Sequence, residues 1–376
     1  MVNSFRRILI LADESADWIV AGLRQLDRLA LSIEEFALEN KEAAPVLVCI
    51  LWKPDLDQTQ RWTPKHERLA MVAFTTGLDG APFDLVVNTR LFLYRKAMRQ
   101  LMDISSPGEK ESWEDNFRQL ELLARSQEGA WEYITDGNQI DEIEKRFLRG
   151  SGKSQDGFVS RYLNRPISRV VTRLLLRFPA TPNAWTLLIL PIPIVASLIL
   201  LHGTYWSFFW GLALFQVFSV LDGCDGEIAR AKFLESASGR RLDYLCDVVS
   251  NILLAIGLGF GLSRESGGLF LGEGLVTAAL IGANEFLLAR RRPEESAAAS
   301  LGGVLYARHR ELVERSGMLV FGEKFASWLI QLTKRDVAML FFVFLAAVGL
   351  PALILHLLLI VTAATLALSL KARSVL

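Results

Sequence analysis

Long apolar runs in the second half of the sequence restrict its fold more than any other feature. A helix needs roughly 20 apolar residues to cross the hydrocarbon core of a bilayer. Six runs near this length can be drawn, the fifth of them only with some extension: 184–202, 206–228, 242–262, 268–289, 337–350 and 352–370. Backbone polar groups in lipid must be satisfied internally, so these runs predict an α-helical integral membrane domain of six transmembrane helices over residues 184–376.

The first 150 residues have a different composition, with charges throughout. Short apolar runs typical of buried strands lie at 7–12, 45–52 and 83–88. Helical patterns lie at 20–38, 112–125 and 139–148. Strands that alternate with helices favour an α/β layer with a mostly parallel sheet. We therefore expect a soluble α/β domain over residues 1–150, followed by a loop that begins at Gly150 and runs to residue 154.

Composition excludes several classes of protein. The 41 Lys and Arg residues balance 41 Asp and Glu residues, and 51% of the chain is apolar, which excludes a disordered tail or a collagen-like repeat. Three cysteines, Cys49, Cys224 and Cys246, are too few and too scattered for a disulfide framework. No basic start followed by an apolar signal segment comes after Met1. We expect the soluble domain to stay in the cytosol, and we expect no nucleic-acid partner.

A basic amphipathic segment precedes the first apolar run. Its arginines recur every four residues among Val, Leu and Ile, at positions Arg161, Arg165, Arg169, Arg173 and Arg177. Such a helix suits the headgroup level of an anionic cytoplasmic leaflet, although an ordinary surface helix with a charged face has the same pattern. We assign residues 151–183 to a linker and a juxtamembrane helix.

The distribution of Lys and Arg orients the predicted spans. Basic residues at 290–292, 334–335 and 371–373 lie on the same side as the amphipathic segment, and the opposite turns contain Arg264 alone. Residues 290–334, with a helical stretch at 301–315, are too polar to cross. We expect a multi-pass protein of the cytoplasmic (inner) membrane with both termini in the cytosol.

Four carboxylates lie at the cytosolic ends of the second and third runs. Asp222 and Asp225 are three residues apart, and Asp243 and Asp247 are four apart, so each pair occupies one helical face. Four clustered carboxylates repel one another strongly, and two hard divalent cations are the natural counter-charge. Oxygen ligands favour Mg²⁺ or Mn²⁺ over zinc and leave positions open for a substrate phosphate.

Small residues and one cation lie beside these carboxylates. Gly226, Ala229 and Gly239 would let a nucleotide diphosphate approach the backbone, although small residues also serve simply to pack membrane helices. Arg230 supplies a positive charge where a diphosphate would lie, or else anchors the helix on the cytosolic side.

The sequence Asp222-x2-Asp225-Gly226-x2-Ala229-Arg230-x8-Gly239-x3-Asp243-x3-Asp247 matches the signature of the CDP-alcohol phosphotransferase family at every position. Eight fixed identities match by chance at a rate on the order of 10⁻¹⁰ per start position. The chain resembles this family over about residues 157–370. The resemblance implies six membrane helices, usually a homodimer, and transfer of a phosphoalcohol group from a CDP-linked donor to an acceptor hydroxyl, with release of CMP.

The resemblance also implies roles for individual residues. Asp222, Asp225 and Asp243 would bind metal, and Asp247 would complete a second metal site and act as general base. The nucleotide site would be lined by the small residues and the cation named above, Gly226, Ala229, Arg230 and Gly239.

Two short elements outside the signature also fit this family. Residues 181–186 resemble the Pro-Asn-x-x-Thr start of its first helix, where Asn183 and Thr186 would face the diphosphate; a helix that begins with Pro gives the same pattern. Lys334 and Arg335 open the fifth run, where they either bind an anionic acceptor such as an inositol phosphate or only anchor the helix.

The junction at 153–168 resembles that of fused inositol-phosphate cytidylyltransferase/di-myo-inositol-phosphate-phosphate synthases, in which a sugar-phosphate nucleotidyltransferase precedes the membrane domain. Residues 20–28 resemble the segment after the nucleotide loop of that enzyme. The loop itself, at 11–18, has no glycine and three acids, which would repel a triphosphate, and residues 87–89 lack the expected metal-binding aspartate. We expect a degenerate nucleotidyltransferase fold with a structural or regulatory role.

Three classes of function share features with this sequence. A transferase leaves its acceptor open: a polyol phosphate such as inositol phosphate is favoured over glycerol phosphate, serine, choline or a second lipid. A transporter would bind coupling ions at its carboxylates, but the sequence lacks a second gate or a pair of broken helices. A membrane-anchored scaffold, whose head binds a partner or a nucleotide, is at odds with an intact signature.

Overall fold

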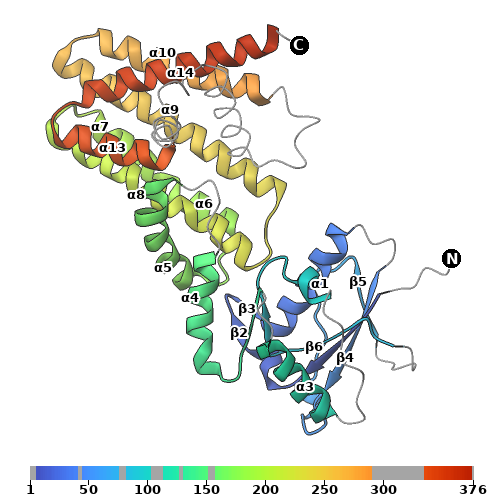
Figure 1. Cartoon of the computed structure of the whole chain (residues 1–376). Coiled ribbons are helices and arrows are strands. Elements are labelled where there is room, and N and C mark those ends of the chain that lie inside the picture. The colour runs from blue at the N-terminus through green and yellow to red at the C-terminus, as the bar shows by residue number, and fades with distance from the viewer. Residues whose placement is uncertain are drawn as a thin grey trace. The chain divides into compact units, whose positions relative to one another are not determined.

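The computed structural model describes residues 6–40, 45–75, 82–102, 113–126, 130–150, 157–289 and 334–374 (Figure 1). The chain divides into two compact units. The first contains residues 1–150 with two short segments, 176–179 and 230–233, and the second contains 151–175, 180–229 and 234–376. The predicted loop begins at Gly150, but the structure places this residue at the end of helix α4 (Ile140–Gly150). The rest of the loop at 151–154, the basic residues at 290–292 and the helical stretch at 301–315 lie outside the described residues.

A four-stranded parallel sheet is the centre of the first unit. Its strands follow the order β5-β4-β1-β6 and are β1 (Arg7–Ala12), β4 (Val46–Trp52), β5 (Val72–Thr75) and β6 (Leu85–Asn88). In the register of the sheet, Leu9 of β1 lies opposite Cys49 of β4 and Val86 of β6. The central strand is apolar on both faces, as a parallel strand covered on both sides must be. The predicted parallel α/β arrangement is confirmed.

Residues of β1 alternate between two apolar cores. Ile8 and Ile10 pack in the core that includes residues of α1 (Gln25–Glu39), whereas Leu9 and Leu11 pack with Leu120 of α3 (Trp113–Ser126). The remaining elements of this unit are small: β2 (Ile19–Val20), β3 (Leu23–Arg24), β7 (Leu91–Leu93), β8 (Trp131–Tyr133), α2 (Met98–Met102) and α4 (Ile140–Gly150). Its described residues also include the 3₁₀ turns η1 (Glu14–Asp17), η2 (Gln58–Gln60) and η3 (Gly137–Gln139).

The helical pattern expected over residues 20–38 begins later in the structure. Strands β2 and β3 form a short antiparallel ribbon, closed by Ala21 and Gly22 with φ of 49° and 77°. Gly22 adopts this left-handed conformation without the strain that a Cβ causes. The helix starts at Gln25 because the apolar residues at 20 and 23 belong to the ribbon.

The first unit also holds the chain segment 230–233 through arginine side chains. Arg28 is 1% exposed, and its Nη2 donates to the carbonyl oxygen of Ala231 at 3.0 Å. Arg95 Nη1 donates to the carbonyl oxygen of Arg230, also at 3.0 Å. Burial is the main cause that lowers the pKa of Arg28 to about 9.

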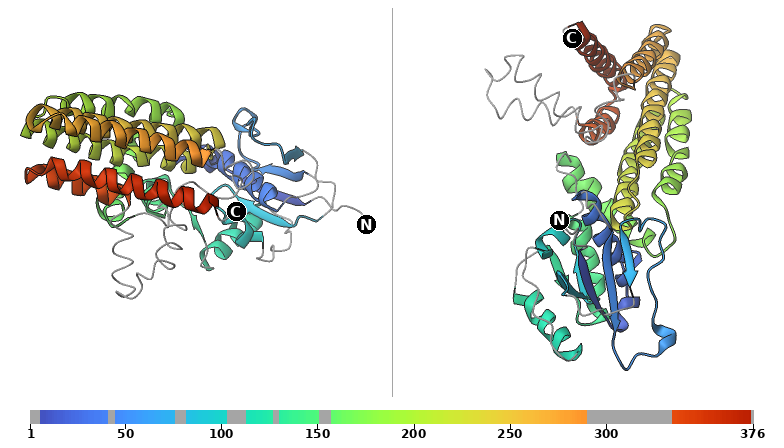
Figure 2. Two further views of the ribbon diagram at one scale, coloured as in Figure 1. Left: turned by 90° about the horizontal axis from the view of Figure 1, so that it is seen from above. Right: turned by 90° about the vertical axis from the view of Figure 1, so that its right-hand side faces the viewer.

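The second unit is helical. It contains the π-helical turn η4 (Ser160–Asn164), α5 (Arg165–Leu175), α6 (Pro182–Ile189), α7 (Pro191–Leu200), α8 (Tyr205–Ala231), α9 (Ala237–Ser266), α10 (Leu269–Ala289), α13 (Arg335–Ala347) and α14 (Pro351–Ser374). The last two residues of α8 belong to the first unit. Helix α9 packs against α7, α10 and α14, and the long helices form a bundle (Figure 2).

Four stretches among the described residues are long and apolar enough to cross a membrane: 182–200, 205–231, 237–266 and 269–287. They coincide with the first four predicted runs. Helix α13 covers much of the fifth run, and Pro351–Ala367 of α14 is a shorter apolar helix in the sixth. Large apolar side chains point outward from this unit, for example Leu188, Trp206 and Phe344, which are 68%, 63% and 60% exposed. The chain is therefore a helical membrane protein with an α/β head.

The first spanning stretch is two helices rather than one. Helix α6 ends at Ile189 and α7 begins at Pro191. Pro191 has no N–H to donate to the preceding turn, and its ring crowds that turn, so the helical ladder breaks there. The other three stretches are the single helices α8, α9 and α10 over their described residues.

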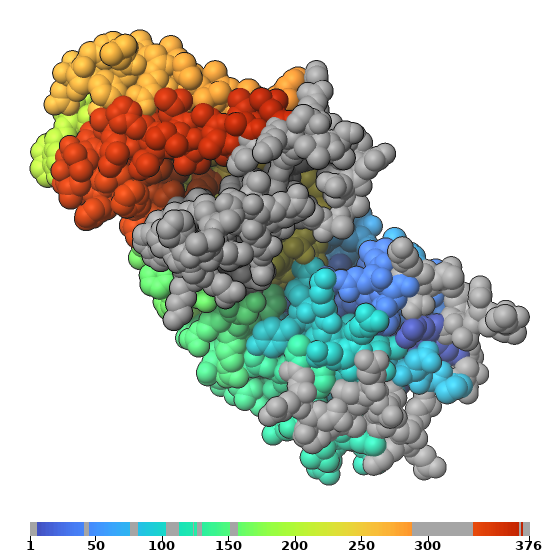
Figure 3. Space-filling view, turned by 45° about the horizontal axis from the view of Figure 1, so that its top comes forward, coloured from blue at the N-terminus to red at the C-terminus, as the bar shows by residue number. Residues whose placement is uncertain are grey.

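Close contacts between helices depend on small residues and on one polar pair. A Cβ placed on Gly259 of α9 would lie 2.8 Å from the Cα of Gly274 of α10, so the two backbones approach as only glycine allows. Helix α10 also lies directly against α14, visible as orange and red surfaces in Figure 3. There His356 Nδ1 lies 2.7 Å from a carboxylate oxygen of Glu273.

The amphipathic helix departs from its predicted orientation. Arg165 is 6% exposed and faces the protein, whereas Ile167, Val170 and Leu174 are exposed. The prediction that its arginines share one headgroup-facing surface is wrong for Arg165, because a buried carboxylate, Glu227, forms an ion pair with it.

Candidate active site

Two membrane helices bring three of the predicted aspartates together. Asp222 and Asp225 of α8 and Asp243 of α9 each offer one carboxylate oxygen, and these oxygens lie within 4.8 Å of one another. Asp222 and Asp225 share a face of α8 because residues three apart are neighbours on a helix. Oxygen ligands at this separation suit a hard divalent cation, which would also offset the repulsion among the carboxylates.

One buried oxygen atom supports a cation in this cluster. Asp222 Oδ1 has no hydrogen-bond partner within the described part of the chain. A buried carboxylate oxygen without a partner costs free energy unless something positive binds it. The donor set therefore fits a metal ion.

The fourth aspartate is paired with an arginine from another helix. Asp247 of α9 forms an ion pair with Arg335 of α13, and Arg335 Nη1 also lies 3.8 Å from Asp222 Oδ2. Arg335 Nη2 donates to Ser250 Oγ at 3.3 Å. The sequence pattern left Arg335 either to bind the acceptor or to anchor the helix, and it did not predict this contact with the aspartates. Charge patterns do not show which loop or helix supplies a counter-charge.

The start of α6 lies against α8 beside the cluster. Thr181 caps α6 by accepting from the backbone N–H of Ala184 at 3.3 Å. Thr186 is 3% exposed, and its Oγ1 donates to Asp225 Oδ2 at 2.7 Å. Trp185 Nε1 donates to the carbonyl oxygen of Leu221 at 2.9 Å. Thr186 thus orients a carboxylate of the cluster, a role that its sequence motif did not predict.

Asn183 and Gly239 lie close together at the starts of α6 and α9. A Cβ on Gly239 would be 2.9 Å from Asn183 Oδ1 and 3.0 Å from Ser236 Oγ. Ser236 is the N-cap of α9 and accepts from the backbone N–H of Gly239 at 3.0 Å. Gly239 therefore permits a close approach of the two helix ends.

For the remaining predicted site residues, the structure gives the position in the fold and does not test the predicted role. Gly226 and Ala229 follow Asp225 on α8, and Lys334 immediately precedes α13. Arg230 belongs to the first unit. Their predicted roles in nucleotide and acceptor binding stay predictions.

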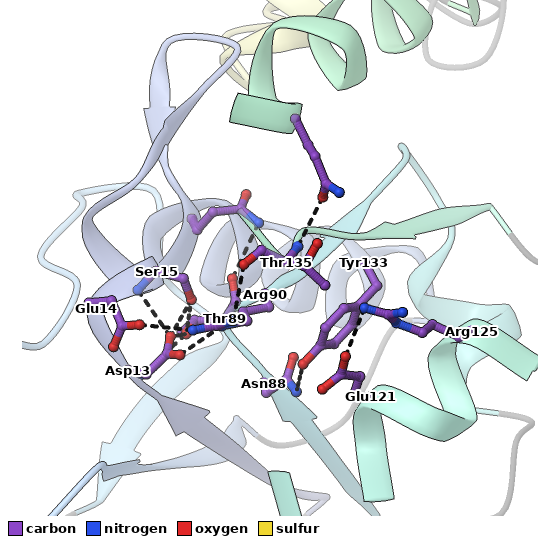
Figure 4. A network of polar contacts seen from close by, with 12 residues as sticks. Asp13, Glu14, Ser15, Asn88, Thr89, Arg90, Glu121, Arg125, Tyr133 and Thr135 are labelled. Atoms are coloured by element: carbon purple, nitrogen blue, oxygen red, sulfur yellow. Dashed lines mark hydrogen bonds and ion pairs between the residues drawn. The ribbon is translucent and has the colours of Figure 1, made fainter. Parts of the chain in front are cut away.

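A polar network closes the carboxyl ends of β1 and β6 in the first unit (Figure 4). The carboxylate of Asp13 is 3% exposed and accepts from Arg90 Nε at 2.8 Å, from Thr89 Oγ1 at 3.1 Å and from the backbone N–H of Ser15 at 3.0 Å. Arg90 Nη2 donates to Glu14 at 2.8 Å. Arg90 thus pairs with two of the three acids expected to repel a triphosphate, Asp13 and Glu14. Asp13 itself takes a backbone N–H of the kind that binds phosphate.

Comparison with known proteins places the membrane unit in a family. A model of the CDP-alcohol phosphatidyltransferase family matches residues 180–370. The chain is 31% identical over 177 residues to a bifunctional IPC transferase and DIPP synthase of Rubrobacter xylanophilus, which covers 46% of this chain and 40% of that protein. Proteins with the same name from Thermococcus kodakarensis and Aquifex aeolicus are 36% and 34% identical over 118 and 119 residues. Each of these two alignments covers 31% of this chain and 26% of the relative.

The chain spans less than half the length of these curated relatives. The family match, in contrast, covers more than half of this chain and includes every aspartate of the cluster, both helices that carry them, and the start of α6. The chain belongs to the CDP-alcohol phosphatidyltransferase family.

Proposed function

We propose that the chain is a membrane-embedded CDP-alcohol phosphotransferase. It would move a substituted phosphate group from a CDP-linked alcohol to an acceptor hydroxyl and release CMP. The observation that carries this proposal is the meeting of Asp222, Asp225 and Asp243 from two helices, with oxygens within 4.8 Å, inside the segment that matches the family.

Asp222, Asp225 and Asp243 would hold Mg²⁺ or Mn²⁺, and Asp247 would complete a site for a second ion. The buried, unpartnered Oδ1 of Asp222 supports this assignment among the described residues. When bound, two such ions would neutralise a diphosphate and stabilise the charge on the leaving CMP. The hydrogen bond from Thr186 would hold Asp225 in a fixed orientation toward them.

The side chains around the cluster would bind the donor. Gly226 and Ala229 add little side-chain bulk next to Asp225, and Gly239, Asn183 and Thr186 would complete the nucleotide site. In the reaction, the acceptor oxygen bonds to the phosphorus that carries the donor alcohol, and the bond from that phosphorus to the CMP oxygen breaks. Asp247 takes the hydroxyl proton as general base.

An anionic acceptor is favoured by the position of Arg335. Its guanidinium lies against Asp247, so an acceptor phosphate held by Arg335 and Lys334 would place a hydroxyl near the general base. This geometry favours a phosphorylated alcohol over an uncharged head-group alcohol. The names of the relatives and the resemblance at 153–168 favour inositol phosphate over glycerol phosphate. A lipid product would give the chain a role in phospholipid biosynthesis.

The same proposal covers the organisation of the whole chain. Residues 184–376 would form a six-helix domain, in which α13 and α14 supply the last two spans, in the cytoplasmic membrane with both termini in the cytosol. Residues 151–183 would be the linker and juxtamembrane helix, and the domain would pair as a homodimer. Residues 1–150 would form a nucleotidyltransferase-like domain without catalytic activity. The pairing of the Asp13 carboxylate with the backbone N–H of Ser15 and with Arg90 supports this, because it leaves an acid where the loop would have to bind a triphosphate.

Release of CMP by the purified full chain tests the proposal. CDP-diacylglycerol and CDP-inositol are offered with Mg²⁺ and Mn²⁺ against a panel of acceptors, and products are identified by mass spectrometry. We expect CMP release that needs one donor and one acceptor together. No release from any pair, in a protein that binds metal, would favour the alternative of a membrane-anchored scaffold whose head binds a partner or a nucleotide.

A further inference from the structure

A fully buried carboxylate lies within the family signature at a position that the signature leaves open. Glu227 of α8 is 0% exposed. It accepts hydrogen bonds from Arg165 Nη1 at 3.0 Å, from Ser168 Oγ at 2.9 Å and from Thr172 Oγ1 at 2.7 Å. Burial of a charged group costs free energy of desolvation, and only well-placed hydrogen-bond and ion-pair partners offset this cost. Three donors from one helical segment satisfy that condition.

The contact between the two helices extends beyond Glu227. Arg165 Nη1 also donates to the carbonyl oxygen of Gly223 at 3.3 Å, and Cys224 Sγ donates to the carbonyl oxygen of Ser168 at 3.5 Å. Gln216 Nε2 donates to Asn164 Oδ1 at 3.0 Å. These hydrogen bonds follow α8 for about three turns. Residues 157–175, the brace, therefore lie along α8 in a fixed register.

The brace holds the side of α8 that faces away from the aspartates. At 3.6 residues per turn, Glu227 points roughly 140° away from Asp222 and roughly 160° away from Asp225 around the helix. Gly223, whose carbonyl oxygen is held by Arg165, is the neighbour of Asp222 in the chain. A shift of the brace would rotate or translate the turn that carries both metal-binding candidates.

The other end of the brace contacts α13 next to Arg335. The backbone N–H of Ser160 donates to the carboxylate of Asp336. A Cβ on Gly157 would overlap the same carboxylate, which would then have to move. Asp336 is the neighbour of Arg335, the residue paired with Asp247. The brace thus contacts α8, which carries Asp222 and Asp225, and α13, which carries Arg335.

We propose that Glu227 and Arg165 are positioning residues, which lock the brace to α8 and so set the geometry of the metal site formed by Asp222, Asp225 and Asp243. The proposal rests on the proposed phosphotransferase function, because that function assigns the metal to these aspartates. Neither Glu227 nor Arg165 would touch the metal or the substrates. Partners that orient metal ligands typically change metal affinity or activity about 10- to 100-fold when they are lost.

The test is Mn²⁺ binding to the purified full chain, followed by electron paramagnetic resonance, which needs neither donor nor acceptor. Glu227→Gln keeps the size of the side chain and removes its charge. Glu273→Gln is the matched control, because Glu273 is a membrane-unit carboxylate on α10 that pairs with His356. We expect Mn²⁺ affinity to fall about 10- to 100-fold in Glu227→Gln and to stay within about threefold of the unmodified chain in Glu273→Gln.

A second variant keeps the test valid if Glu227→Gln fails to fold. Arg165→Lys retains the charge but cannot bridge Glu227 and the carbonyl of Gly223 with one planar group, so we expect a smaller loss of Mn²⁺ affinity and a raised KM for the donor. Folding is checked by gel filtration and thermal midpoint. Unchanged Mn²⁺ affinity in both folded variants would overturn the proposal.

The outcomes separate this proposal from the proposed function. An unmodified chain that releases CMP, with variants that bind Mn²⁺ normally, refutes the positioning role alone. An unmodified chain that binds Mn²⁺ but forms no product, with variants that lose Mn²⁺, supports the positioning role and counts against the phosphotransferase. An unmodified chain without Mn²⁺ affinity overturns both.

Discussion

Thr186→Val tests how the start of α6 supports the aspartate cluster. The substitution keeps the shape of the side chain and removes the hydroxyl that donates to Asp225 Oδ2 at 2.7 Å. Thr186 is 3% exposed, so water cannot easily replace this hydrogen bond. Hydrogen bonds to charged groups contribute about 1.5–3 kcal/mol. If the whole amount is lost from the orientation of Asp225, kcat/KM falls roughly 10- to 150-fold.

The control for this variant is another buried threonine in the membrane unit. Thr186 Oγ1 also lies 3.1 Å from the carbonyl oxygen of Pro182, one turn earlier in its helix. Thr277 of α10 has the same arrangement, with Oγ1 2.8 Å from the carbonyl oxygen of Glu273. Thr277→Val therefore removes the backbone hydrogen bond alone, and we expect it to leave kcat/KM unchanged.

The assay is CMP release at several Mn²⁺ concentrations, so that metal affinity and turnover are measured separately. We expect Thr186→Val to need more Mn²⁺ for half-maximal rate and to lose turnover, with a thermal midpoint close to that of Thr277→Val. Equal kinetics in the two variants would refute the reasoning, because the carboxylate hydrogen bond would then have no effect on the site.

Three further predictions follow from the same geometry. Asp247→Asn should abolish turnover and leave CDP-donor binding, measured by calorimetry, largely intact; normal turnover would remove Asp247 from the role of general base. Removal of divalent cations with a chelator should stop CMP release, and added Mg²⁺ or Mn²⁺ should restore it. Ca²⁺ should not restore it, because Ca²⁺ prefers longer ligand distances and higher coordination numbers. Full activity in the presence of chelator would contradict a metal-dependent site. Gly239→Ala should lower kcat/KM about tenfold, because its Cβ would lie 2.9 Å from Asn183 Oδ1. Gly282→Ala is the control and should leave kcat/KM unchanged, because nothing lies within 4 Å of its Cβ. Equal rates for the two variants would show that activity does not need the close approach of Asn183 to Gly239.

Periodicity and hydropathy predicted the main elements of the fold. The apolar runs at 184–202, 206–228, 242–262 and 268–289 correspond to helical stretches of spanning length, and the runs at 7–12, 45–52 and 83–88 correspond to strands of a parallel sheet. These signals are strong because burial in lipid or between layers requires apolar side chains in succession.

Tertiary contacts were harder to predict because a pattern does not identify its partner. The arginine repeat in 157–179 predicts one charged face, but it does not show that Arg165 turns inward to a carboxylate more than fifty residues later in the chain. The break at Pro191 is a local property that a hydropathy window averages away. The short strands β7 and β8 stay hidden for a similar reason, since three residues carry too little periodicity.

In the candidate site, too, some features were predictable from the sequence and others were not. The spacing of Asp222, Asp225 and Asp243 predicts two carboxylate faces on two helices, and the structure brings the three residues together. The contacts that support them come from other parts of the chain: Thr186 from α6 and Arg335 from α13. Their residue types occur widely as helix caps and anchors, so only the folded chain shows their contact with the aspartates.

The most direct test of the central claim is the ratio of products formed by the purified full chain with Mn²⁺. With a donor and acceptor pair chosen from the panel, CMP and the phosphodiester are quantified together by ³¹P NMR. A phosphotransferase releases one CMP for each phosphodiester formed, and the cluster variant Asp225→Asn should form neither. CMP without a phosphodiester, or product formation that survives Asp225→Asn, would contradict the proposed function.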